Sequence, residues 1–167
     1  MKENLPRKFG IIGLPGSGKS TFASKLGEIL NIPVHHLDRH MFEPDGKKKD
    51  KQEFIEIQKA MLDEAAWVVE GCSFSTFEMR FARADILIYL HFPFIVCFWR
   101  MLKRLFDYKK EFGGLRKITW ELLKYTWNFD NEKRATIEEL SRKYPQTKFL
   151  IFKGQKDADL FIKSLES

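Results

Sequence analysis

The residues most suited to chemistry lie near the start of the chain. Residues Gly13 to Ser20 read GLPGSGKS and match G-x-x-x-x-G-K-[ST] at every fixed position. Glycines let successive backbone N–H groups turn inward around phosphate oxygens, and a helix that begins near Lys19 directs its positive dipole end at the same anion. Lys19 would neutralise the β- and γ-phosphates, and the Ser20 hydroxyl would ligate Mg²⁺. The motif therefore predicts a nucleoside triphosphate site formed by Gly13, Pro15, Gly16, Ser17, Gly18, Lys19 and Ser20.

Two carboxylates follow apolar segments that read as strands. Asp38 lies just past residues 33–37, where it would face the ligand cleft and hold an attacking hydroxyl or accept its proton. A helix cap or a solvated side chain is the alternative for Asp38. Glu70 ends the segment Trp67–Glu70, where it would hold Mg²⁺ through water, with capping of the next turn as the alternative. A metal site on the nearby histidines is disfavoured because no Cys/His partner set accompanies His35, His36 and His40.

Several arginines follow these carboxylates in the sequence. Arg80 lies on a short predicted helix after Glu70, Arg100 and Arg104 lie one helical turn apart, and Arg134 begins a later helix. Arginines in a segment that closes over the site would stabilise charge on a phosphoryl group in transfer. The alternative is a set of solvated helix faces. The stretch from residue 100 to 118 carries seven Lys or Arg against two acids and contains a double glycine.

The elements that must position these side chains alternate between strands and helices. Apolar runs predict strands at residues 8–12, 33–37, 67–70, 85–90 and 147–152. Helical spacing and breakers predict helices at residues 19–30, 52–66, 75–83, 93–109, 115–127, 131–143 and 157–165. Such alternation favours one parallel sheet with helices on both faces, which binds ligands at the carboxyl ends of its strands. A chain of 167 residues without repeats suits a single domain.

Composition limits the partners without choosing one. The net charge of +6 favours anionic partners, whether nucleotides, phosphorylated small molecules, nucleic acid or a membrane surface. The most apolar run, Ile86–Trp99, is too short to span a bilayer. Cys72 and Cys97 form no metal spacing and no disulfide framework, so we expect free thiols in a reducing cytoplasm. No obligate protein partner is evident.

Together these residues resemble the nucleoside-monophosphate-kinase-like group of P-loop proteins, which includes adenylate kinase and shikimate kinase. More closely, the chain resembles the bacterial DNA-topology-modulation proteins of the FlaR type. The resemblance spans nearly the whole chain and is carried by Gly13–Thr21, His36–Asp38, Trp67–Gly71, Arg80–Asp85, Phe98–Arg104 and Trp127–Phe129. It implies a three-layer α/β P-loop fold, with a five-stranded parallel sheet in the order 2-3-1-4-5 and a mobile helical lid after strand four, at about residues 100–134.

The resemblance also implies an activity and a role for each matched residue. It implies transfer of the γ-phosphate of ATP·Mg²⁺ to a small acceptor, such as a nucleoside or nucleotide. Thr21 joins the nucleotide-binding loop, and the metal residues are Ser20 and Glu70. The acceptor residues are Asp38, Gly71 and Arg80. The catalytic residues are Lys19, Asp38, Arg100, Arg104 and Arg134. The chain departs from the pattern on the acceptor side, with Cys72 and Ser73 in place of Asn-Tyr and His91 in place of an acid.

Two other functions fit parts of the sequence. The first is a nucleotide-dependent regulator or ATPase associated with nucleic acid. Its aromatic residues would stack on bases from a basic face, although the same helical spacing is typical of a core; they are Phe106, Tyr108, Phe112, Trp120 and Trp127. The second is a GTPase switch, which is disfavoured because the chain has no Asn-Lys-x-Asp sequence to read guanine.

Overall fold

A five-stranded sheet forms the centre of the computed structural model, which describes residues 6–41, 43, 47, 49–112 and 133–166. Every strand pair is parallel, and the spatial order is β2-β3-β1-β4-β5. The α/β class and the strand order expected from the sequence are therefore confirmed. The strands are β1 (Lys8–Gly13), β2 (Val34–His36), β3 (Trp67–Glu70), β4 (Ile86–Leu90) and β5 (Lys148–Phe152).

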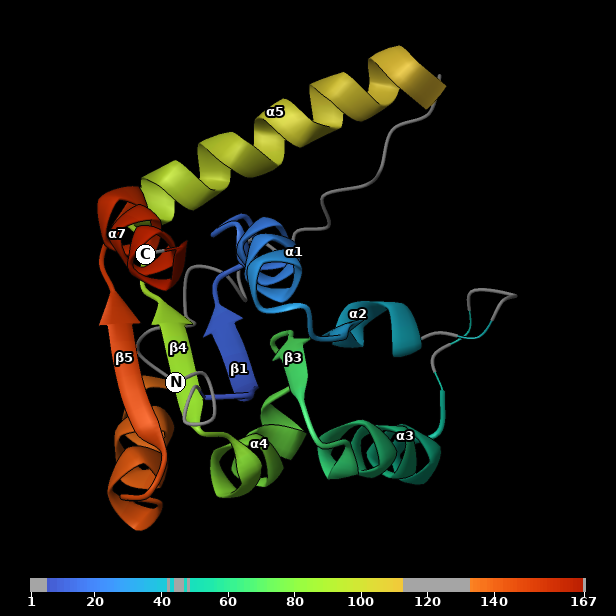
Figure 1. Cartoon of the computed structure of the whole chain (residues 1–167). Helices are drawn as coiled ribbons and strands as arrows, with labels where there is room; N and C mark the ends of the chain where they lie inside the picture. Colours follow the sequence, from blue (N-terminus) through green and yellow to red (C-terminus); the bar gives the residue numbers. More distant parts are fainter. Residues whose placement is uncertain (1–5, 42, 44–46, 48, 113–132, 167) are drawn as a thin grey trace.

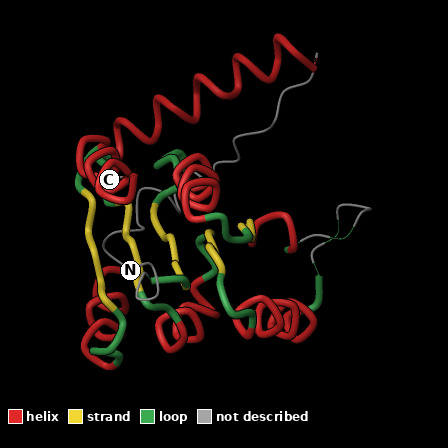
Figure 2. Tube along the Cα trace, in the orientation of Figure 1, coloured by secondary structure: helices red, strands yellow, loops and turns green. Residues whose placement is uncertain are grey.

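Helices cover both faces of the sheet (Figure 1; red in Figure 2). α1 and α7 lie over one face, while α3, α4 and the helix at residues 133–143 lie over the other. α5 starts beside α7 and extends away from the rest of the described chain. The bounds are α1 (Lys19–Leu30), α2 (Leu37–His40), α3 (Lys51–Asp63), α4 (Phe77–Arg83), α5 (Phe94–Phe112) and α7 (Gln155–Glu166).

The central strands are apolar because both of their faces are covered. Every residue of β3 (WVVE) and β4 (ILIYL) is buried, as is typical of parallel strands between two helical layers. β1 lies between these two strands, with Ile11 opposite Glu70 on one side and opposite Ile88 on the other. On the far side of β3, His36 of β2 lies opposite Glu70. This register brings the carboxyl ends of β1, β2 and β3 to one edge of the sheet.

The prediction of a strand at residues 33–37 is wrong at its end. β2 stops at His36, and Leu37 begins the short helix α2. The reason is burial: Leu37 is 0% exposed and belongs to a second apolar cluster, between α3 and β3, that includes Phe54 and Trp67. A continued strand would not carry Leu37 into that cluster, so the chain turns. Asp38 consequently lies in a helical turn and not at a strand end.

Two further boundaries differ, and part of the predicted lid is not described. α3 ends at Asp63, three residues before the expected end, and a 3₁₀ turn at Phe74–Thr76 precedes α4. The predicted helix at 115–127 and much of the predicted lid at 100–134 lie outside the described residues. Where the chain is described, no helix has both the length and the apolar character that a bilayer crossing requires. The two cysteines are free thiols, as expected.

Gly71 follows the last residue of β3 and offers a test of this packing. Its φ is +147°, and an added Cβ would lie 2.8 Å from the Cβ of Leu37, too close for either backbone to stay in place. We expect Gly71→Ala to lower the free energy of unfolding by about 1–3 kcal/mol in urea denaturation, through backbone strain and displacement of α2. Gly154→Ala is the control, since a Cβ there meets open space. Equal stability of the two variants would contradict the packing described.

Candidate active site

The predicted phosphate-binding loop connects β1 to α1 and turns at its glycines. Gly16 and Gly18 have φ angles of 81° and 88°, in the left-handed region that favours glycine, and Gly18 is the N-cap of α1. A Cβ at Gly16 would also overlap the carbonyl oxygen of Cys97 in α5. Glycine is therefore required at position 16 by the backbone conformation and by close packing against α5.

The loop brings a cation and the N-terminus of a helix to one place. Lys19 is 7% exposed, and its Nζ donates to the carbonyl oxygen of Leu14 at 2.8 Å. The N–H of Ser17 donates to the same carbonyl at 3.1 Å. The ammonium is thus held beside the first turn of α1, whose free N–H groups carry partial positive charge. Such an arrangement favours a bound phosphate group.

Glu70 is the most buried carboxylate of the described site. Only 3% of its side chain is exposed. Its Oε1 accepts a hydrogen bond from Ser20 Oγ at 3.0 Å and lies 2.8 Å from Nδ1 of His36. Among the described residues its Oε2 has no hydrogen-bond partner. Glu70 therefore connects β3 to α1 and β2. These contacts do not fit the alternative interpretation, in which Glu70 caps the turn that follows it.

The oxygens of Ser20 and Glu70 fit a magnesium ion held with a nucleotide. Mg²⁺ prefers hard oxygen ligands and is usually bound by one or two protein groups together with phosphate oxygens and water. The Oε2 oxygen of Glu70, which is buried and has no hydrogen-bond partner among the described residues, is a ligand of that kind. A site made of protein ligands alone is not formed, because the described residues contain no cluster of three or more metal-binding side chains. His35, His36 and His40 therefore do not form such a cluster.

Asp38 lies in the first turn of α2, within electrostatic range of the loop. It does not cap the helix, because the N-cap residue is His36, but it is exposed, as the solvated alternative expects. The surrounding protein removes part of its hydration, and the nearby Glu70 adds a like charge, so the pKa of Asp38 is raised above its ordinary value. Lys19 and Arg80 act in the opposite direction. The structure therefore brings Asp38, Glu70 and Lys19 into one electrostatic environment.

Arg80 holds the loop that follows β3. It is 0% exposed, and its Nη1 and Nη2 donate to the carbonyl oxygens of Gly71 and Ser73 at 2.8 and 2.7 Å. Its guanidinium carbon lies 4.5 Å from the centre of the Phe77 ring. In the described structure Arg80 therefore holds the backbone at Gly71 and Ser73. Direct contact between Arg80 and an acceptor stays a prediction.

The three predicted lid arginines differ in where they lie. Arg100 is at the loop: its Nη1 donates to the Ser17 carbonyl at 3.4 Å and its Nη2 to Gln155 Oε1 at 3.2 Å. Arg134 is exposed, and its Nε donates to Glu138 within its own helix at 2.9 Å. The side chain of Arg104 lies outside the described part of the chain. The aromatic residues behind the nucleic-acid alternative also have undescribed side chains; they are Phe106, Tyr108, Phe112, Trp120 and Trp127.

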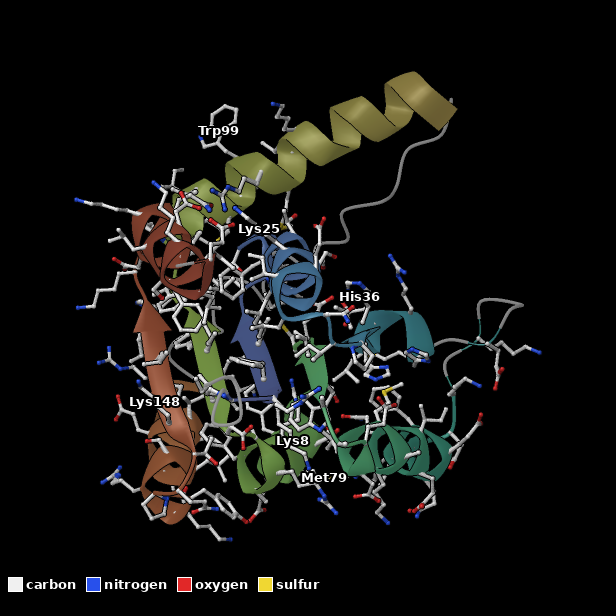
Figure 3. The ribbon with its side chains drawn as sticks, in the orientation of Figure 1. Lys8, Lys25, His36, Met79, Trp99 and Lys148 are labelled. Atoms are coloured by element: carbon white, nitrogen blue, oxygen red, sulfur yellow. The ribbon has the colours of Figure 1, made fainter. Side chains whose placement is uncertain are left out.

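A pocket of about 430 Å³ opens beside the loop, between α1, α5 and α7. This volume is in the range of small-ligand sites. Lys25 of α1 is part of the pocket lining and lies on the side of α1 that faces α5 (Figure 3). No sequence motif predicts most of the lining, since Gln155 and Asp159 of α7 come to the pocket only through the order of the strands. Its lining includes Gly16, Ser17, Gly18, Thr21, Phe22, Phe92, Arg100, Gln155, Asp159 and Ile162.

Known structures share this architecture, although no protein-family model and no curated protein matches the chain. The chain is similar to a shikimate kinase from Acinetobacter baumannii in complex with shikimate, with a TM-score of 0.61, 16% identity and coverage of 98% of this chain and 92% of that one. For a shikimate kinase from Bacteroides thetaiotaomicron the values are 0.58, 18%, 97% and 97%. For a gluconokinase from Sinorhizobium meliloti they are 0.54, 17%, 96% and 89%. At these identities the likeness shows the fold.

The raised pKa of Asp38 has a consequence for stability. Below its unfolded-state pKa, near 3.8, Asp38 is protonated in both the folded and the unfolded state, and its contribution to stability is fully present. This contribution is lost as the pH rises through the raised folded-state pKa. We expect Asp38→Asn to raise the Tm at pH 7 and the gain to shrink as the pH falls toward 4, measured by calorimetry. Glu139→Gln, an exposed carboxylate on the helix at 133–143, should change the Tm little at any pH. A lower Tm for Asp38→Asn at pH 7 would contradict the assignment.

Proposed function

We propose that this protein is a small-molecule kinase that transfers the γ-phosphate of ATP·Mg²⁺ to a hydroxyl of an acceptor such as a nucleoside or nucleotide. One observation carries the proposal: the carboxyl ends of β1, β2 and β3 bring a phosphate-binding loop and two carboxylates, Asp38 and Glu70, to the same edge of the sheet. The similar structures include shikimate kinases and a gluconokinase, which is consistent with this class of reaction.

The nucleotide side of the site follows from the loop. The backbone N–H groups from Gly13 to Thr21 would bind the phosphates, with Lys19 placed to neutralise the charge that builds up on them. The pocket between α1, α5 and α7 is lined in part by Gly16 and Gly18, and it would hold the base and ribose. Arg100 lies between this pocket and the loop, where its guanidinium would meet phosphate oxygens.

Ser20 and Glu70 would hold the Mg²⁺ of the nucleotide, Ser20 through its hydroxyl and Glu70 through water. A magnesium ion in this position neutralises phosphate charge as it develops. The chain's own contribution is to fix these oxygens, since Ser20 Oγ and Glu70 Oε1 already lie 3.0 Å apart. Arg104 and Arg134 remain candidates for further charge stabilisation from the predicted lid.

Asp38 would act on the acceptor. A bond forms between the acceptor oxygen and the γ-phosphorus, the bond from phosphorus to the β–γ bridging oxygen breaks, and ADP leaves. The proton of the acceptor hydroxyl passes to Asp38, whose raised pKa makes it a stronger base than an ordinary aspartate. Gly71, held by Arg80, would form the floor of the acceptor pocket.

Lys19→Ala tests the nucleotide half. Loss of a hydrogen bond to a charged group is worth about 1.5–3 kcal/mol, so ATP affinity should fall by roughly 10- to 150-fold in calorimetric titration. The fold should persist, because Lys19 contacts the loop and lies outside the apolar clusters. Lys163→Ala, in the last turn of α7, is the control and should bind ATP as the parent does. Unchanged affinity in Lys19→Ala would refute the assignment of the loop.

Asp38→Asn tests the transfer step. ATP binding should stay within about twofold, while ADP release that depends on an acceptor should slow by roughly 10²–10⁴, as is typical for a lost acid–base group. The assay follows ADP release with a panel of nucleosides, nucleoside monophosphates and small polyols. A normal rate in this variant would remove Asp38 from the mechanism, and a parent protein inactive with every acceptor would count against the kinase itself.

A further inference from the structure

His36 is placed to control the carboxylate that serves the metal. We propose that His36 is a positioning residue, which holds Glu70 in the orientation needed for the Mg²⁺ of a bound nucleotide. The proposal rests on the kinase function proposed above. It is carried by a contact between two neighbouring strand ends, where His36 Nδ1 lies 2.8 Å from Glu70 Oε1.

The contact is fixed by the sheet. His36 is the last residue of β2 and Glu70 the last of β3, and the two are paired in the parallel register. Figure 3 shows His36 where the chain passes from β2 into α2, beside α1. Only 15% of its side chain and 3% of that of Glu70 are exposed. An ionised carboxylate can only accept hydrogen bonds, so the tautomer that fits this contact has its N–H at Nδ1 and donates a hydrogen bond to Oε1.

Both contacts of Glu70 fall on the same oxygen. Ser20 Oγ donates to Oε1 at 3.0 Å from α1, while His36 reaches it from β2. Two donors from separate elements fix the rotation of the carboxylate about its last bond. Oε2 is buried and is left without a hydrogen-bond partner in the described structure, so it is the oxygen that would accept a hydrogen bond from water on a bound metal ion. Groups that hold a metal-binding carboxylate in this way typically change metal affinity by roughly 10- to 100-fold when they are removed.

Ser20 alone would not hold the carboxylate once a nucleotide is bound. Its hydroxyl is then needed as a ligand for the metal, and the hydrogen bond that it donates to Glu70 weakens. His36 has no such competing task in the proposed site. The imidazole is therefore the contact that keeps Glu70 oriented throughout binding.

The adjacent histidine provides a matched control. His35 also pairs with a glutamate, since its Nε2 lies 3.2 Å from Glu64 Oε2. Successive side chains of a strand point to opposite faces, so His35 and His36 make similar pairs in different places. Substitution at position 35 removes a histidine–glutamate contact of the same kind without touching Glu70.

The experiment measures ATP affinity by calorimetry, with MgCl₂ or with EDTA, at one pH. The parent protein should bind ATP more tightly with Mg²⁺, and His36→Leu should reduce this gain by roughly 10- to 100-fold while affinity in EDTA stays near that of the parent. His36→Asn should keep the gain, because its amide nitrogen lies near the position of Nδ1. His36→Gln, whose amide lies near the position of Nε2, should lose it. His35→Leu should behave as the parent does.

Each other result has a defined meaning. Equal losses of affinity in Mg²⁺ and EDTA would make His36 a structural residue and overturn the proposal, as would an unchanged gain in His36→Leu. If His36→Leu does not fold, the comparison of His36→Asn with His36→Gln decides, and equal behaviour of the two overturns the proposal. A parent protein that binds no ATP would refute the proposed function itself. One that binds ATP equally in Mg²⁺ and EDTA would overturn the roles of both Glu70 and His36.

Discussion

Burial of the Glu70 carboxylate constrains the arrangement of the whole site. Moving an ionised carboxylate out of water costs several kcal/mol unless hydrogen bonds or opposite charges replace its hydration. Here the replacement comes from two elements, α1 through Ser20 and β2 through His36. The Ser20 contact depends on the pairing of β1 with β3, and the His36 contact on the pairing of β2 with β3, so the two form together only in the complete sheet. The position of the proposed metal oxygens is therefore a consequence of the topology.

The phosphate-binding loop is coupled in a similar way to the helix that leads into the predicted lid. Gly16 packs against the carbonyl of Cys97, and Arg100, one turn further along α5, donates to the carbonyl of Ser17. A shift of α5 would therefore be felt at the loop. The same helix also lines the pocket beside α7. α5 therefore contacts both the loop, at Gly16 and Ser17, and the pocket.

The extent to which the sequence predicted this site depends on how local each feature is. The turn at Gly13 to Ser20 was predictable because its conformation is encoded in eight consecutive residues. The central strands were predictable because burial on both faces leaves an uninterrupted apolar run, as in β4. The α2 turn was missed, since the pull of Leu37 into the cluster with Phe54 comes from distant packing. The contacts of Arg80 and of His36 depend on folded distances that spacing does not reveal.

The charges around Asp38, on the proposed acceptor side, are held by hydrogen bonds to the backbone or to neighbouring side chains. Lys19 is tied to the Leu14 carbonyl and Arg80 to the carbonyls of Gly71 and Ser73, so both cations act on Asp38 from fixed positions. Glu70 opposes them from a position that is fixed as well. Charges held by the fold need no reorganisation when a phosphoryl group is transferred, and such preorganised electrostatics is commonly the largest contribution to catalysis. In the proposed mechanism the burial of Arg80 would therefore contribute more than packing, because an arginine held by two carbonyls keeps its position better than a solvated one.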